Sequence, residues 1–123
     1  MFSIKTLTCT AAIALIAVGS ANAAEVTWDT GSGDSSVTGG DGTWNTTNSN
    51  WTTDGGDSNV VWNNNNNDTA VFGGDTGTVT LGSDVTVGGM TFNTNNYSVV
   101  PDGSGITFGA PGDINVSTGT TTI

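Results

Sequence analysis

Positive charge is nearly missing from this sequence. Its 123 residues include one Lys or Arg, no His and 11 Asp or Glu, which gives a formal net charge of −10 at pH 7. The single cation, Lys5, lies close to the amino terminus. Proteins that bind nucleic acids or anionic lipids place Lys and Arg against the phosphates, and an arginine clamp, a lysine Schiff base or a histidine base needs those side chains. We therefore expect no nucleic-acid partner, no membrane insertion by the mature segment and none of these catalytic devices.

Cysteine and apolar residues are also scarce. Cys9 is the only cysteine, and hydrophobic residues make up 34% of the chain. Downstream of Cys9 the chain cannot form a disulfide, a thiolate nucleophile or a zinc–thiolate site. A small secreted domain without disulfides has to gain its stability in another way, and the regular stacking of similar coils is one such way.

Residues 1–23 are typical of a helical secretory signal peptide. Lys5 supplies the positive start, residues 11–18 form the apolar run, and Ala21-Asn22-Ala23 matches the small-x-small rule for cleavage. The run is too short for a transmembrane helix. Cys9 precedes the run, so it does not occupy the position of a lipid-attachment cysteine. We predict that the mature chain begins at Ala24, carries no basic side chain and is exported.

Strand periodicity dominates the second half of the chain. In residues 78–92, TVTLGSDVTVGGMTF, apolar residues recur two positions apart at 79 and 81, at 85 and 87, and at 90 and 92. Residues at this spacing fall on the same face of an extended strand. Gly82-Ser83-Asp84 and Gly88-Gly89 separate the pairs and favour turns. The spacing fits both an antiparallel meander and the tight corners of a parallel β-coil, so it leaves the strand direction open.

The same pattern continues to the end of the chain. Further apolar pairs follow at Tyr97 and Val99, Ile106 and Phe108, and Ile114 and Val116. Pro101 and Pro111 are placed in the turns between them, where a missing N–H costs least. Three such strands would complete one coil in about twenty residues. We predict an all-β chain that buries these apolar side chains in one interior and directs its Thr residues outward.

The tryptophans all lie in the region of residues 24–68, as Trp28, Trp44, Trp51 and Trp62. Exposed in a row, indole rings would form a platform on which sugars stack, whereas buried indoles would form a small core or an end cap. This region has few aliphatic residues for its own packing, so the core interpretation is favoured. We expect a Trp- and Asn-rich cap over residues 24–68, followed by β-solenoid strands over residues 69–123.

Two Asp-Thr-Gly triplets, at Asp29 and Asp75, resemble the active-site motif of aspartic proteases, in which two such aspartates share one proton. A chain rich in these three residues also forms the triplet in ordinary turns. Asp29 follows the predicted mature start too closely for the strands that precede the motif in a protease. We expect turns here, no catalytic residue and no enzyme activity, and the protease half is the disfavoured alternative.

Aspartates in Gly- and Asn-rich loops are the kind of oxygen ligand that calcium prefers, and the chain has five: Asp34, Asp41, Asp54, Asp57 and Asp68. No EF-hand loop and no repeated G-G-x-G-x-D nonapeptide occurs, so a solvated acidic surface is favoured, and we predict no metal and no cofactor.

Five N-x-[ST] triplets are interpreted as composition or as Asn ladders between coils, not as glycan acceptors. They start at Asn45, Asn50, Asn67, Asn96 and Asn115.

Several segments follow one another in a recognisable order: Gly42-Thr43-Trp44-Asn45, Asn50-Trp51, Asp68 to Phe72, Thr78 to Leu81, Val85 to Phe92, Gly105 to Gly109, Ile114 to Val116 and Gly119 to Ile123. In this order, over nearly the whole mature chain, they resemble the start of a secreted bacterial protein with autotransporter-associated β-strand repeats. The resemblance implies a right-handed parallel β-helix passenger displayed outside a Gram-negative cell.

Two features of such proteins do not occur in these residues. The glycine-rich repeat, a G-x-G-x-L-x-L strand followed by an N-x-Y turn, is absent, and so are the many amphipathic strands of a translocator barrel. We therefore expect a truncated or partial passenger: its cap and first coils, non-enzymatic, with adhesion or surface display as its role. An extracellular carbohydrate- or calcium-binding module is the alternative. The expected partners are a cell-surface or matrix ligand, or further copies of the chain at an open C-terminal edge.

Overall fold

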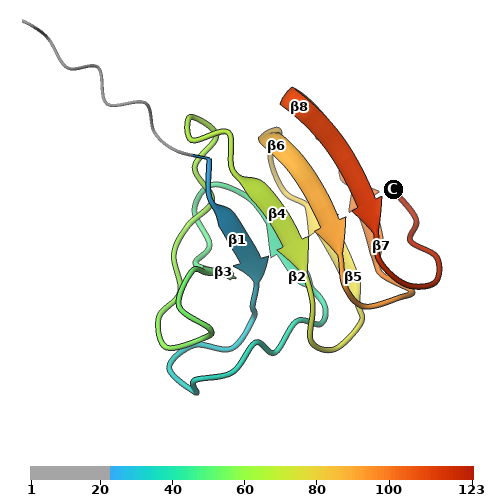
Figure 1. Cartoon of the computed structure of the whole chain (residues 1–123). Coiled ribbons are helices and arrows are strands. Elements are labelled where there is room, and N and C mark those ends of the chain that lie inside the picture. The colour runs from blue at the N-terminus through green and yellow to red at the C-terminus, as the bar shows by residue number, and fades with distance from the viewer. Residues whose placement is uncertain (1–22) are drawn as a thin grey trace, which may run out of the picture.

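The computed structural model describes residues 23–123, so the predicted signal peptide, apart from Ala23, lies outside the described residues. Over this range the chain is all-β, as predicted (Figure 1). Residues 23–123 contain no helix long and apolar enough to span a bilayer. The strands are β1 (Glu25–Trp28), β2 (Gly42–Trp44), β3 (Trp51–Thr52), β4 (Thr69–Phe72), β5 (Thr78–Leu81), β6 (Val85–Phe92), β7 (Ser98–Pro101) and β8 (Ile106–Val116).

The strands form two sheets. One has the order β3-β1-β4-β6-β8 and the other the order β2-β5-β7. Only the pair β1 and β3 is antiparallel, and every other neighbouring pair of strands is parallel. From β4 onward the chain alternates between the two sheets, and this crossing lets each strand return in the same direction as its predecessor. The strand direction that the sequence left open is therefore parallel.

Each turn of the chain lies beside the preceding turn, and the middle turns repeat after twenty residues. Thr69 of β4 is opposite Gly89 of β6, twenty positions later, and Thr78 of β5 is opposite Ser98 of β7 at the same separation. The predicted length of about twenty residues per coil is confirmed for these turns. The first turn is longer, since Glu25 of β1 pairs with Thr69. The additional residues form β3 and the loops around it, at the β1 end of the larger sheet (Figure 1).

Period-two burial determines which side chains face the interior. β1 and β5 both show the pattern exposed, buried, intermediate, buried, with apolar residues at the buried positions. The predicted core residues of residues 78–99 are indeed buried: Val79, Leu81, Val85, Val87, Met90, Phe92, Tyr97 and Val99. They pack with the tryptophans and with Phe72 in one hydrophobic cluster. Strands of both predicted regions, residues 24–68 and 69–123, pair within the same sheets.

The turn predicted at Gly88-Gly89 is wrong, because both residues lie inside β6 and are buried. The two predicted strands on either side of them are one strand, and its register with β8 shifts between Val87 and Gly89. A Cβ atom on Gly88 would clash with the main-chain oxygen of Asn67. The close approach of the Asn67 loop, not a reversal of the chain, therefore requires glycine here.

Pro111, Gly112 and Asp113 fall within the bounds of β8, but residues 109–112 have no partner in β6, because the register passes from Val87–Phe108 to Gly89–Asp113. Gly112 has a φ of 77°, so the turn predicted here is a bulge inside one strand and not a break between two strands. Pro101, likewise placed in a turn, is the last residue of β7 and pairs with Leu81. β8 pairs with β6 on one side, and no strand of residues 23–123 pairs with its other side. A proline is tolerated at such a position because an edge strand has N–H groups that need no partner in the sheet.

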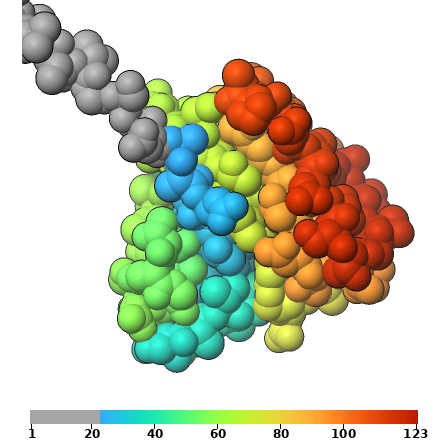
Figure 2. All heavy atoms as spheres, in the orientation of Figure 1, coloured from blue at the N-terminus to red at the C-terminus, as the bar shows by residue number. Residues whose placement is uncertain are grey.

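Burial at the β8 end differs from the prediction. The exposed fractions of Phe108, Ile114 and Val116 are 38%, 49% and 39%, and only Ile106 packs partly against the core. The burial pattern of β8 does not alternate, and no further turn of residues 23–123 covers these side chains. The prediction that they are buried is therefore wrong for the last strand. Figure 2 shows the C-terminal segment, in orange-red to red, along one side of the molecule.

Candidate functional sites

The tryptophans form a cluster inside the first turn. Trp28, Trp44 and Trp51 are 0% exposed and Trp62 is 2% exposed. The Trp51 ring is central, with centroids 5.2 Å from Trp28, 4.8 Å from Trp44 and 4.7 Å from Trp62, in tilted or edge-to-face geometry. Such aromatic pairs stabilise a core beyond the area they bury. A buried indole offers no face to a sugar, so the stacking platform is wrong and the core interpretation is confirmed.

Phe72 connects the tryptophan cluster to the next turn of the chain. Its ring centroid lies 5.6 Å from that of Trp51 and 5.8 Å from that of Trp44. On its other side it stacks on Phe92 at 4.7 Å with an interplanar angle of 9°. Phe72 and Phe92 are register partners in β4 and β6, so the parallel pairing itself stacks the two rings.

Tyr97 links its own turn to the two preceding turns of the chain through its hydroxyl. Its Oη donates to the main-chain oxygen of Gly73 or Asp75, both at 2.7 Å, and accepts from the N–H of Gly40 at 3.3 Å. Burial raises the pKa of Tyr97, the hydrogen bond from Gly40 opposes this shift, and the nearby negative charge of Asp75 adds to it. The hydroxyl is thus held neutral as a cross-turn donor. The sequence predicted Tyr97 only as one member of an apolar pair with Val99, and it did not predict these hydrogen bonds.

The two Asp-Thr-Gly triplets lie in two separate segments, the first directly after β1 and the second between β4 and β5. Asp29 is 0% exposed, and its Oδ1 accepts from the N–H groups of Gly31 at 3.1 Å and Thr38 at 3.0 Å. Asp75 is exposed, and its main-chain oxygen accepts from Gly40 and Tyr97. A protease dyad requires both carboxylates in one water-accessible site, where they share a proton. One enclosed and one exposed carboxylate do not meet that requirement.

The carboxylates of the five aspartates considered for calcium accept hydrogen bonds from protein groups, either within their own loop or from another segment of the chain. Asp41 Oδ1 accepts from the N–H of Thr78 at 2.6 Å and so joins two turns of the chain. Asp54 accepts from the Ser58 hydroxyl at 2.6 Å and the Thr52 hydroxyl at 2.8 Å. These bonds, that from Ser58 first, lower the pKa of Asp54 to about 2. Asp34 and Asp57 bond to nearby serines, and Asp68 bonds to Ala24.

A small group of buried oxygens lies beside Asp29. Asp29 Oδ2, Thr38 Oγ1 and Asn59 Oδ1 are buried without a hydrogen-bond partner among the described residues. Asn59 Nδ2 donates to the main-chain oxygens of Asp29 and Gly31, which fixes the orientation of its amide. These are oxygen types that calcium accepts. Residues 23–123 contain no group of three or more His, Cys, Asp or Glu side chains that could hold a metal ion.

The asparagines form cross-turn bonds to the main chain. Asn64 accepts from the N–H of Thr86 at 2.9 Å and donates to the oxygen of Asp84 at 3.1 Å. Asn67 Nδ2 donates to the oxygen of Ala110 at 2.7 Å. The chain thus uses Asn amides to join neighbouring turns, which is the role expected of them, although the partners here are main-chain atoms and not other Asn side chains.

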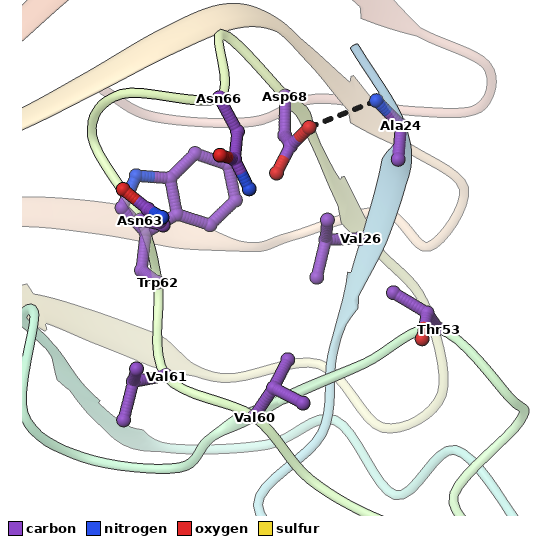
Figure 3. A pocket seen from close by; sticks show the side chains of 9 residues that line it. All are labelled: Ala24, Val26, Thr53, Val60, Val61, Trp62, Asn63, Asn66 and Asp68. Carbon is purple, nitrogen blue, oxygen red and sulfur yellow. Dashed lines mark hydrogen bonds between the residues drawn. The ribbon is translucent and has the colours of Figure 1, made fainter. Parts of the chain in front are cut away.

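Two hollows mark opposite ends of the larger sheet. The first, of about 380 Å³, lies at the β1 end, and Figure 3 shows its lining. Val26, Val60, Val61 and Trp62 supply apolar walls, and Asn63, Asn66 and Asp68 supply polar groups. On its rim the Ala24 nitrogen donates to Asp68 Oδ1 at 2.8 Å. The second, of about 270 Å³, lies beside β8, where Ile106, Phe108 and Ile123 are part of a mostly apolar lining.

These features define a class of protein: an all-β chain of parallel, stacked turns, with an aromatic cluster in its long first turn and an exposed apolar strand at the other end. The chain is 45% identical over 115 residues to a segment of "Adhesin BmaC autotransporter" from Brucella suis biovar 1 (strain 1330). The resemblance to autotransporter proteins is thereby confirmed.

The match covers 90% of this chain and 3% of that relative, so the chain spans only a small part of the relative's length. No family model matches the chain. No solved structure matches it either.

Proposed function

We propose that this chain is the cap and the first coils of the passenger of a surface-displayed adhesin. The observation that carries the proposal is the 45% identity over 90% of this chain to an autotransporter adhesin. Surface position outside a Gram-negative cell and export across the inner membrane follow from that proposal and from the predicted signal peptide. The role is structural and not enzymatic.

The stacked turns support the finer assignment to a parallel β-helix. In such a solenoid each coil contacts only its neighbours, so the coil at one end needs a closure. The long first turn, with its four buried tryptophans, occupies that position at the β1 end. We assign residues 24–68 to the cap, residues 69–123 to the coils and residues 1–23 to the signal peptide.

The exposed β8 end supports continuation of the stack. The free edge of β8 and its exposed apolar side chains offer a template for one more parallel strand. In the proposed function this strand belongs to a further coil of the passenger, and in the isolated segment it belongs to a second copy.

The test is surface display in the bacterium that encodes the chain. Antibodies against residues 24–123 should label intact cells, and protease added outside should remove the label. Phe72→Ala in the buried core should lower surface labelling and adhesion to cultured cells together, while Asp102→Asn, at an exposed loop residue, should leave both at the wild-type level. Labelling that appears only after the cells are permeabilised would contradict the proposal.

Calcium binding is a second candidate, favoured by the buried oxygens of Asp29, Thr38 and Asn59 that have no protein partner in the described part of the chain. Addition of 1 mM calcium should then raise the melting temperature of the wild type and not that of Asp29→Asn. Equal melting temperatures with calcium and with a chelator would remove this candidate.

A further inference from the structure

The predicted cleavage point of the signal peptide coincides with a specific contact in the fold. Ala24, the predicted first residue of the mature chain, directs its main-chain nitrogen at Asp68 Oδ1, 2.8 Å away (Figure 3). Its carbonyl oxygen accepts from the N–H of Thr69 at 2.8 Å. Ala24 is therefore fixed on both sides, at the point where β1 begins beside β4.

Asp68 is a buried carboxylate with no cationic side chain to compensate its charge. The residue is 5% exposed, and a carboxylate at this depth is costly unless a cation or several donors compensate it. The chain offers no side-chain cation for this purpose, because it has one Lys or Arg and no His, and the single one is Lys5 in the predicted leader. Residues 24–123 have no cationic side chain, so the only cation that they can supply is the amino group created by cleavage.

We propose that Asp68 is the binding site for the α-ammonium group of the processed N-terminus. Hydrolysis of the Ala23–Ala24 peptide bond adds one water, leaves a carboxylate on Ala23 and an amine on Ala24, and the amine takes up a proton. The hydrogen bond from a neutral amide to Asp68 then becomes a charge-assisted ion pair. Removal of the leader thereby strengthens the contact that holds the start of β1 against the loop before β4.

This ion pair connects export to folding. The precursor retains the weaker amide contact, and the mature chain gains the stronger one only after cleavage. The inference rests on the predicted cleavage site and not on the adhesin assignment, so a chain without adhesive function would still form the pair.

The absence of lysine from the mature chain makes the test specific. The full chain, expressed with its own leader in a Gram-negative host and purified after export, should begin at Ala24 by mass spectrometry. Amine reagents then modify one group only. At pH 7, acetylation of the wild type should be about tenfold slower than that of Asp68→Asn, the factor that one unit in the pKa of an α-amino group produces. The exposed carboxylate of Asp102 provides the matched control, and Asp102→Asn should react at the wild-type rate.

A second measurement uses the wild type alone, in case Asp68→Asn fails to fold. Acetylation removes the charge of the amino group, whereas reductive dimethylation keeps it. The acetylated protein should melt at a lower temperature than the unmodified protein, and the dimethylated protein should melt close to it. A mature N-terminus other than Ala24, equal acetylation rates in wild type and a folded Asp68→Asn, or equal melting of the two modified forms would overturn the proposal.

Discussion

Phe72 is the residue whose truncation should most clearly distinguish a tightly packed core from a loose aromatic cluster. It is 0% exposed and contacts rings of both the first turn and the next one. Truncation of a buried Phe to Ala costs about 3–5 kcal/mol through lost transfer energy and a residual cavity. A domain of about 100 residues has a total stability of about 5–15 kcal/mol. Phe72→Ala should therefore remove about a fifth or more of the free energy of unfolding.

Urea denaturation followed by tryptophan fluorescence measures this loss directly, because three indoles lie around the Phe72 ring. With a denaturant slope of about 2 kcal/mol/M, a loss of about 4 kcal/mol lowers the urea midpoint by about 2 M. The matched control is Phe108→Ala on β8, where the same side chain is 38% exposed and its loss should cost about 1 kcal/mol. Equal urea midpoints for the two variants would refute the conclusion that Phe72 is a core residue and Phe108 is not.

Three further predictions concern the contacts that join the turns. Tyr97→Phe should destabilise the chain by about 1–3 kcal/mol in the same urea assay, because the main-chain groups that share its hydroxyl lose that partner; no change would show that water replaces the hydroxyl. Asp54 should titrate at about 2 by NMR and closer to its ordinary value in Ser58→Ala. Since its pKa is lowered in the folded state, its contribution to stability is present above about pH 4 and is lost as the pH falls toward 2, and an unaltered titration in the variant would contradict this. The purified mature chain should self-associate in light scattering when salt screens its charge or when acid protonates its carboxylates, and Phe108→Glu should reduce this association; a wild type that stays monomeric under both conditions would show that the β8 edge is closed.

Local pattern alone was sufficient to predict the strands and most of the core. The alternation at 79 and 81, 85 and 87, and 90 and 92 repeats at the period of a β-strand, and those side chains are buried. The burial of the four tryptophans was also predictable, because few aliphatic residues are available near them in sequence. The first Asp-Thr-Gly triplet does form a local side-chain turn, from Gly31 N–H to Asp29 Oδ1, whereas Asp75 of the second lies in an isolated bridge with Gly39.

The sites depended on contacts between residues far apart in sequence. Asp68 receives Ala24 from 44 positions away, and Tyr97 bonds to main-chain groups on two other turns. No spacing rule reports such pairs, because they arise only when stacked turns bring distant segments together. This explains why Asp68 was predicted only as one of several loop aspartates and Tyr97 only as an apolar strand residue.

What the sequence by itself determined is the alternation of apolar and polar side chains, because a strand presents its neighbours to opposite faces wherever it lies. What only the tertiary structure decided is the strand direction, the continuity of β6 through Gly88-Gly89 and of β8 through Pro111, and the exposure of Phe108. Glycine and proline are compatible with a turn, a close backbone approach or a sheet edge alike. Which of these occurs depends on the neighbouring turn: the Asn67 loop that approaches Gly88, and the register shift against β6 that leaves Pro111 without a partner in the sheet.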